Sequence, residues 1–371
     1  MRKTGAEIVW EMLEREGVEV VFGIPGGGIM HTYHPRQDYG IHHVLVRHEQ
    51  SAAHAADGYA RASGRVGVAI ATSGPGATNL VTGIATAMMD SSPIVCITGQ
   101  VSTSVLGTDA FQEADITGIT LPITKHNYLV TEIDELAATI YDAFRIASSG
   151  RPGPVLIDLP SDVQKAETEF VPPAEATTYR PRDLPSPDPA DLERAIELID
   201  RAHRPVILAG RGVLLSNAAD RLTAFAEKTQ TPVALTLLGK GAFSPDHPLY
   251  LGMMGMHGHS TANHAIQEAD LLIALGMRFD DRVTGNPAVY ALQARKIHID
   301  IDAAELSKVI PTDVLVHSDL RPALEVIAEG ATNRHHEEWL GRIGQWRDES
   351  HAHEALHQAP NEVDLLEACR H

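Results

Sequence analysis

The chain has 371 residues, of which 43% are hydrophobic, and a formal net charge of −19 at pH 7. The length predicts two domains, and the acidic balance argues against nucleic acid as a partner, because phosphate binding requires a basic face. Two cysteines, no apolar run of the ~20 residues that a membrane span needs and no signal peptide predict a cytoplasmic protein without a disulfide framework.

Residues 1–164 alternate strand and helix patterns. A helix is expected over residues 4–16, where Ile8 and Met12 share one face and Gly17 follows as a stop. Strands are expected near positions 20, 45, 69, 96 and 156, with helices between them that include 80–89 and 135–148. This alternation predicts a parallel sheet covered on both faces.

A proline-rich stretch at 165–189 predicts an extended linker, and a second α/β domain is expected over 190–330. Its expected strands are 205–209, 232–236, 270–275, 296–301 and 314–316, with helices near 190–202, 216–228, 260–268 and 320–329. The fold class is therefore α/β, with two doubly wound parallel-sheet domains. Residues 331–371 are interpreted as a polar tail without a strand, and no metal site is expected in the chain.

Glu49 follows an expected buried strand at 43–46 and begins an alanine-rich helix, and a second strand-to-helix unit follows at 68–79. An acid at such a place is most often a first-turn residue that the helix dipole favours. Two strand ends that meet two helix starts, however, also make the kind of crevice where open α/β sheets bind ligands. We expect apolar surroundings for Glu49.

Six stretches carry a resemblance to one family. They are GIPGG (23–27), RHEQ (47–50), TSGPGATN (72–79), GTDAFQE (107–113), GRPGP (150–154) and MRFDDRV (277–283). In this order they resemble the catalytic large subunit of acetolactate synthase, a thiamine-diphosphate-dependent enzyme, over most of residues 1–330. The resemblance implies a pyrimidine-binding first domain and a central FAD-binding-type second domain.

The resemblance implies roles for single residues. Glu49 matches the glutamate that hydrogen-bonds the aminopyrimidine ring, and Gln112 matches an amide at the reacting carbon that can donate to an oxyanion. Phe111 and Arg282 match substrate residues, and the arginine grips a carboxylate. Ile24, Gly26, Pro75 and Asn79 match the aminopyrimidine pocket. For Arg282 a surface ion pair with Asp280 or Asp281 is the alternative.

The implied FAD, which is structural in this family, would contact residues matching Arg151, Gly210, Gly212, Thr236, Leu237, Leu238, His257, Gly276, Arg278, Asp280, Val283, Asp300, Ile301 and Asp319. Four positions depart from the family pattern. Ile24 stands where tyrosine is common, Arg211 replaces a flavin-turn glycine, and Ser102 and Ser161 stand in place of proline and lysine.

Family members carry a third domain that binds diphosphate and Mg²⁺ through Gly-Asp-Gly and Asn-Asn, and neither pattern occurs in this sequence. The chain is thus expected to supply only the aminopyrimidine half of each site. A homodimer or higher homo-oligomer, a regulatory small subunit and a separate diphosphate-binding chain are the expected partners. The alternatives are a truncated, non-catalytic cofactor-binding or assembly partner and a related carboligase with another 2-ketoacid. Glyoxylate carboligase is an example of such a carboligase, but it lacks the acid that matches Glu49, so the presence of Glu49 argues against it.

Overall fold

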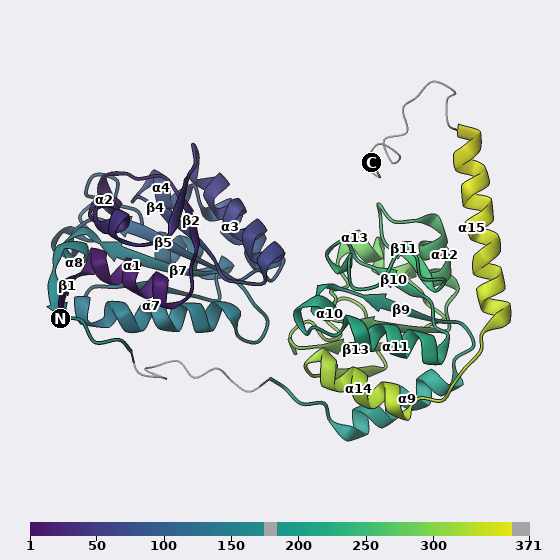
Figure 1. The fold of residues 1–371 in the computed structure, drawn as a ribbon. Helices are drawn as coiled ribbons and strands as arrows, with labels where there is room; N and C mark the ends of the chain where they lie inside the picture. Colours follow the sequence, from purple (N-terminus) through teal and green to yellow (C-terminus); the bar gives the residue numbers. More distant parts are fainter. Residues whose placement is uncertain (174–183, 358–371) are drawn as a thin grey trace. The chain divides into compact units, whose positions relative to one another are not determined.

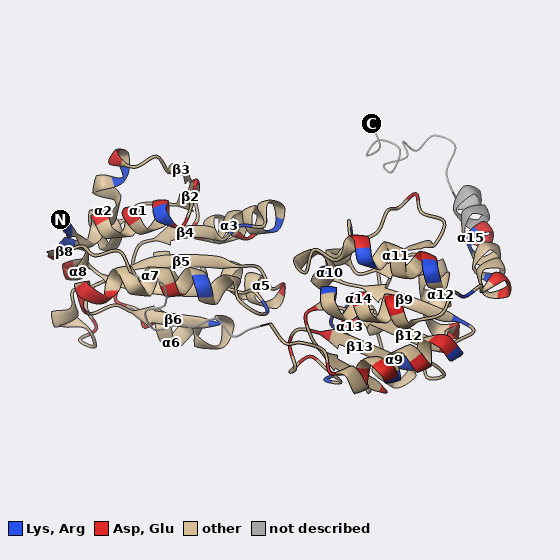
Figure 2. Ribbon diagram, turned by 60° about the horizontal axis from the view of Figure 1, so that its bottom comes forward, with Lys and Arg blue, Asp and Glu red and all other residues tan. Residues whose placement is uncertain are grey.

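A computed structural model describes residues 1–173 and 184–357, with side chains up to Ser350. The chain divides into two compact units, Met1–Asp183 and Leu184–His371. The expected fold class is confirmed, because each unit contains a parallel six-stranded sheet with helices on both faces (Figure 1). The charged residues lie mostly on the helices and loops that cover the sheets (Figure 2).

The elements of unit 1 are β1 (Arg2–Thr4), α1 (Gly5–Arg15), β2 (Val20–Gly23), α2 (Met30–Tyr33), β3 (His42–Leu45), α3 (Glu49–Ser63), β4 (Gly67–Ala71), α4 (Pro75–Thr78), α5 (Val81–Met89), β5 (Ile94–Gln100), α6 (Ile116–Thr120), β6 (His126–Leu129), α7 (Ile133–Ser148), β7 (Val155–Pro160), α8 (Ser161–Lys165) and β8 (Glu167–Glu169). The sheet order is β3-β2-β4-β5-β7-β6, and β1 pairs with β8 in a separate antiparallel ribbon.

Successive side chains of each strand point to opposite faces, so every buried strand contributes to two cores. In β4, Val68 and Ile70 pack with α1 and α7, whereas Ala69 and Ala71 pack with the alanines of α3 and with α5. Cys96 is fully buried on the α3 side, which confirms its interpretation as a core residue. The small side chains on this face allow α3 to pack closely on β4 and thereby fix where the helix begins.

The expectation of a buried strand before Glu49 is wrong in one respect. The strand β3 is the edge of the sheet, and its Leu45 side chain is 66% exposed. The structure also contains β6, which the strand pattern missed, at the opposite edge.

The elements of unit 2 are α9 (Pro189–Arg201), β9 (Pro205–Ala209), α10 (Arg211–Leu215), α11 (Ala219–Thr229), β10 (Val233–Leu235), β11 (Tyr250–Met253), α12 (Ser260–Glu268), β12 (Leu271–Leu275), α13 (Asp281–Thr284), β13 (Arg295–Asp300), β14 (Val314–His317), α14 (Leu320–Gly330) and α15 (Glu337–His357). The sheet order is β11-β10-β9-β12-β13-β14. Counted along the chain, this is the order 3-2-1-4-5-6 of doubly wound nucleotide-binding sheets.

The expected polar tail differs from what the structure contains. Residues Glu337–His357 form α15, and Trp339 and Ile343 are buried with α12 and β12 in the core of unit 2. The Trp339 indole donates to the carbonyl of Pro205 at 3.1 Å. This helix therefore completes one face of the second sheet. The central part of the expected linker, 174–183, lies outside the described residues.

Candidate functional site

The site begins at the carboxyl ends of three neighbouring strands of unit 1, β3, β2 and β4. The helix α3 starts at Glu49 because the preceding His48 is extended and its Nδ1 accepts from the backbone N–H of Gln50 at 3.1 Å. A side chain that caps the first turn satisfies a donor that the helix itself leaves unpaired. The cap fixes Glu49 as the first helical residue, at the edge where the loops after β2 and β4 also emerge.

The Glu49 carboxylate meets the loop after β4. The Nδ2 of Asn79 donates to Oε2 of Glu49 at 2.9 Å, and Oε1 lies 3.3 Å from where a Cβ on Gly76 would stand. Within unit 1, Oε1 makes no hydrogen bond to a described residue. One oxygen is thus held by an amide, and the other lies beside Gly76, whose missing Cβ lets the Thr72 side chain pack against its backbone.

The glycine-rich loop after β2 packs against the same segment. The backbone N–H of Gly28 donates to Oγ1 of Thr72 at 3.0 Å, and a Cβ on Gly26 would lie 2.6 Å from Cγ2 of Thr72. Ile24, which precedes them, is partly buried. The structure therefore brings the loops of the predicted pyrimidine residues Ile24, Gly26, Pro75 and Asn79 to one sheet edge beside Glu49.

The predicted substrate loop reaches this edge through Gln112. Its carbonyl oxygen would lie 2.7 Å from a Cβ on Gly74, so the two backbones touch. Gln112 itself has φ +57°, in the left-handed region that non-glycine residues rarely adopt. The Glu113 carboxylate closes the loop by accepting from the backbone N–H groups of Gly107 at 2.5 Å and Ala110 at 2.9 Å. The neighbouring Phe111 is 88% exposed in this chain.

A buried carboxyl beneath this loop was missed by sequence reasoning. Asp158 of β7 is 2% exposed and accepts from Oγ1 of Thr98 at 2.8 Å and from Nε2 of Gln100 at 2.9 Å. Burial raises its pKa to about 7, although these hydrogen bonds act in the opposite direction. The sequence did contain a sign of it, because Asp158 is the single acid in the apolar run 155–159.

Asp158→Asn should abolish a pH dependence of stability. The folded pKa of about 7 lies above the ordinary 3.8, so the folded protein keeps a proton that the unfolded chain has already released. The contribution of this proton to the free energy of unfolding should therefore be largest below about pH 4 and decline as the pH rises to about 7, by up to about 4 kcal/mol. Asparagine resembles the protonated carboxyl, so the variant should lack this decline. Urea unfolding at several pH values measures it, and equal declines in both proteins would contradict the assignment.

In unit 2 the predicted FAD residues lie at or after the carboxyl ends of all six strands of the sheet, β9 to β14. Where the strand order reverses, between β9 and β12, two turns cross at van der Waals distance. The backbone N–H of Gly212 donates to the carbonyl of Gly276 at 2.9 Å, and a Cβ on Gly210 would lie 2.3 Å from that oxygen. Such a switch point is where doubly wound sheets hold dinucleotides, so the residues present fit FAD. Arg211 is the first residue of α10 beside this crossing.

Three of the predicted cofactor carboxylates also cap turns. Asp280 accepts from the backbone N–H groups of Arg282 and Val283, both at 3.1 Å, Asp319 accepts from Arg321 at 3.0 Å, and Asp300 accepts from Asp302 at 2.9 Å. Thr236 likewise accepts from the N–H of Gly239 at 3.0 Å. Leu237 and His257 are exposed, and Leu238, Arg278 and Ile301 are partly buried. The caps fix the turns on which a ligand would rest.

The two predicted arginines lie in different settings. Arg282 is exposed, and its Nε lies 3.9 Å from Oδ2 of Asp281, which is a weak surface pair. Arg151 belongs to unit 1, where its Nε donates to Oγ of Ser91 at 2.9 Å. Arg151 is therefore the one predicted FAD residue that lies in unit 1, whereas the others lie in unit 2.

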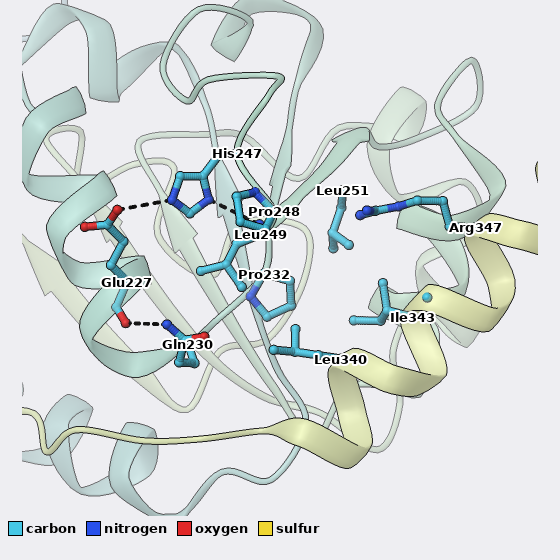
Figure 3. A pocket seen from close by; sticks show the side chains of 11 residues that line it. Glu227, Gln230, Pro232, His247, Pro248, Leu249, Leu251, Leu340, Ile343 and Arg347 are labelled. Atoms are coloured by element: carbon cyan, nitrogen blue, oxygen red, sulfur yellow. Dashed lines mark hydrogen bonds and ion pairs between the residues drawn. The ribbon is translucent and has the colours of Figure 1, made fainter.

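Sequence reasoning also missed a cavity of about 370 Å³ in unit 2 (Figure 3). Leu340 and Ile343 of α15 face Pro232 and Leu249 across it, and a hydrogen bond of 3.3 Å joins Nε2 of His247 to Oε1 of Glu227 on its wall. None of its lining residues belongs to the predicted cofactor set. The cavity went unnoticed because it exists only once α15 packs on the sheet.

Two searches of the described residues gave negative results. No three His, Cys, Asp or Glu side chains among them gather in a way that could hold a metal ion. None of the helices described is long and apolar enough to cross a membrane.

Comparison with known proteins matches both units to domains of one enzyme family. Residues 3–119 match the family model "Thiamine pyrophosphate enzyme, N-terminal TPP binding domain", and residues 192–327 match "Thiamine pyrophosphate enzyme, central domain". The acetolactate synthase large subunit of Corynebacterium glutamicum is 49% identical over 94% of this chain and 55% of its own length. That of Parasynechococcus marenigrum is 49% identical over 93% and 58%. Acetolactate synthase isozyme 2 large subunit of Escherichia coli K12 is 47% identical over 93% and 62%. The chain thus spans little more than half the length of these relatives.

Proposed function

The chain belongs to the thiamine pyrophosphate enzymes, and from this premise we propose that it acts as the part of an acetolactate synthase large subunit that binds and activates the aminopyrimidine ring of thiamine diphosphate. One observation carries the proposal. The Glu49 carboxylate lies beside the glycine-containing loop after β4, with one oxygen held by Asn79 and the other without a hydrogen bond to any described residue. A carboxylate in that state can accept or share a proton with a ring nitrogen.

The proposed reaction is decarboxylation of pyruvate and transfer of the remaining two-carbon unit to pyruvate or 2-ketobutyrate. Thiamine diphosphate, when bound, supplies the carbon nucleophile. Glu49 would share a proton with the pyrimidine nitrogen, and Asn79 would hold that carboxylate in place. The Gln112 amide would donate to a developing oxyanion, and Arg282 would bind the carboxylate of the second 2-ketoacid. The exposed Phe111 would contact substrate.

FAD is proposed as a structural cofactor of unit 2. Support comes from the strand order and from the crossing of Gly210, Gly212 and Gly276 at its reversal. Because a ligand that binds only the folded state stabilises it by mass action, FAD should raise the melting temperature of the purified chain.

Leu237→Glu should weaken FAD binding at least tenfold, because it puts a charge on an apolar side chain of the predicted site that is 68% exposed. Leu292→Glu is the matched control, since Leu292 is 72% exposed and lies outside that set. Thermal shift with increasing FAD measures both. No shift in the wild-type chain, or the same loss in both variants, would contradict the site.

The partners are proposals of the same kind. Mg²⁺ and the diphosphate would be bound by a domain beyond the part of the relatives that this chain matches, or by a separate chain. We propose a homodimer or higher homo-oligomer, with a regulatory small subunit as a further partner. Support comes from the exposed apolar side chains Leu45 and Phe111, which lie at the edge that holds the site. A cytoplasmic location stays a prediction.

The proposed function is tested by acetolactate formation from pyruvate with thiamine diphosphate, Mg²⁺ and FAD. The chain is assayed alone and together with a separately produced diphosphate-binding domain. We expect turnover in the mixture. A mixture that binds both cofactors but forms no acetolactate would favour the non-catalytic alternative, or another 2-ketoacid as substrate if one is consumed.

A further inference from the structure

The loop that carries Phe111 and Gln112 is fastened to unit 1 at two points. At its beginning, Thr103 binds Asp162 of α8, with Oγ1 donating at 2.5 Å and the backbone N–H at 3.1 Å. At its end, the carbonyl oxygen of Ala114 accepts from Nε2 of Gln100 at 2.9 Å. The two side chains that hold the loop, Asp162 of α8 and Gln100 at the end of β5, lie outside it. The loop conformation is therefore set by the sheet as well as by its own turns.

Gln100 is the more deeply placed of the two attachments. It is the last residue of β5, is 3% exposed, and uses the whole amide group. Its Nε2 donates to Ala114 and to Asp158, and its Oε1 accepts from the backbone N–H of Val101 at 2.8 Å. A buried amide with every group in use has one orientation, since any rotation leaves a buried polar group unpaired.

Ala114 follows Gln112 by two residues, so the position of its carbonyl determines where Gln112 lies. Gln112 rests on Gly74 with its backbone in the left-handed region. A non-glycine residue holds that conformation only where its surroundings impose it. Gly74 is joined through Pro75 to Gly76, which lies beside Glu49. A continuous series of contacts and bonds thus leads from Asp158 through Gln100 and Ala114 to the loop beside Glu49.

We propose that Gln100 is a positioning residue, oriented by Asp158, that fixes Gln112 on Gly74 and so sets the distance between the Gln112 amide and the Glu49 carboxylate. Gln100 faces the core and touches no reacting atom; it acts through the backbone of residues 112–114. The consequence for catalysis rests on the proposed function, whereas the consequence for the loop does not.

Amide hydrogen exchange of the purified chain tests the proposal without cofactor or turnover. The backbone N–H groups of Gly107 and Ala110 donate hydrogen bonds to the Glu113 carboxylate. In Gln100→Met these two amides should exchange at least tenfold faster than in the wild type. Gln164→Met is the matched control, because Gln164 is also a buried amide, 0% exposed, whose Nε2 donates to the carbonyls of Gly28 and Leu159. The control should leave these two amides unchanged.

If Gln100→Met does not fold, Gln100→Asn replaces it. The shorter side chain keeps a buried amide but withdraws the donor from Ala114 by about 1.5 Å, one carbon–carbon bond, and it should release the loop in the same way. Unchanged exchange at Gly107 and Ala110, or equal acceleration in Gln164→Met, would overturn the proposal.

Turnover tests the second half. In a preparation whose wild type forms acetolactate, Gln100→Met should lower kcat at least tenfold while the Kd for thiamine diphosphate changes less than threefold. A variant that loses cofactor affinity instead would show a general structural role and overturn the positioning role. If the wild type itself is inactive, the proposed function fails, and the exchange result still decides the role of Gln100 in the loop.

Discussion

Glu49→Gln should lower acetolactate formation by a factor of about 10²–10⁴, the range by which a positioned acid or base contributes to a reaction. The amide keeps the shape of the side chain and a carbonyl oxygen that can accept a hydrogen bond from Nδ2 of Asn79. In the wild type this nitrogen lies 2.9 Å from Oε2 of Glu49. The amide cannot take up a proton at neutral pH, so the exchange of a proton with the pyrimidine nitrogen should be lost while the contact with Asn79 is preserved. Initial rates with saturating cofactors measure the effect.

Glu135→Gln is the matched control for this substitution. Glu135 also lies in the first turn of a helix, α7, and is exposed. Both changes remove one negative charge that interacts with a helix N-terminus, worth about 0.3–1 kcal/mol, so only the loss of the site separates them. A Glu49→Gln protein that keeps wild-type turnover would show that Glu49 is a first-turn acid of its helix and nothing more.

Gly74→Ala should have the largest effect on stability, about 2–4 kcal/mol, and should also displace the substrate loop. Gly74 has φ +57° and ψ −119°, a conformation that residues with a Cβ adopt only at a cost of about 1–3 kcal/mol. The added Cβ would also lie 2.7 Å from the carbonyl oxygen of Gln112, far inside contact distance. Urea unfolding measures the stability, and protease cleavage within 103–113 measures the loop.

Gly64→Ala separates the two causes. Gly64 ends α3 with φ +72° and ψ 8°, and a Cβ there would meet nothing within 4 Å. This control should cost about 1 kcal/mol from the backbone alone and leave the loop intact. If Gly74→Ala costs no more than Gly64→Ala and the loop stays protected, Gln112 does not rest on Gly74 as described.

The buried strands and the long amphipathic helices could be predicted from the sequence because their signal is local. Strands such as β5 and β7 are continuous apolar runs, and α1, α7 and α9 repeat apolar residues at helical spacing. The edge strands β6 and β11 were missed for the complementary reason. An edge strand has a neighbour on one side only and is often short, and the residues HNYL at 126–129 and YLGM at 250–253 show no alternation of apolar and polar side chains. The same reason explains why Leu45 of β3 is exposed.

The helix α15 had a signal that was overlooked. Trp339, Ile343 and Trp346 recur at helical spacing within a charged segment, and that spacing places them on one face. Charge density favoured the interpretation as a tail. The burial of Trp339 and Ile343 against β12 and α12 shows that this interpretation was wrong for the helix.

At the candidate site, the identity of Glu49, Pro75, Asn79 and Gln112 came from the sequence, and their mutual arrangement came from the structure. Asp158 and Gln100 lie 58 positions apart in the chain, and no local pattern predicts that their side chains meet. The left-handed backbone of Gln112 is equally hidden, because glutamine gives no sign of it. Long-range polar contacts and single strained residues are therefore what sequence reasoning could not supply.

The measurement that tests the central claim most directly is exchange of the thiamine diphosphate C2 proton with deuterated solvent, followed by NMR. The chain is studied together with a separately produced diphosphate-binding domain. We expect exchange much faster than for the free cofactor, a loss of that acceleration in Glu49→Gln and its retention in Glu135→Gln. Bound cofactor without accelerated exchange, or acceleration that survives Glu49→Gln, would contradict the assignment of Glu49 as the residue that activates the cofactor.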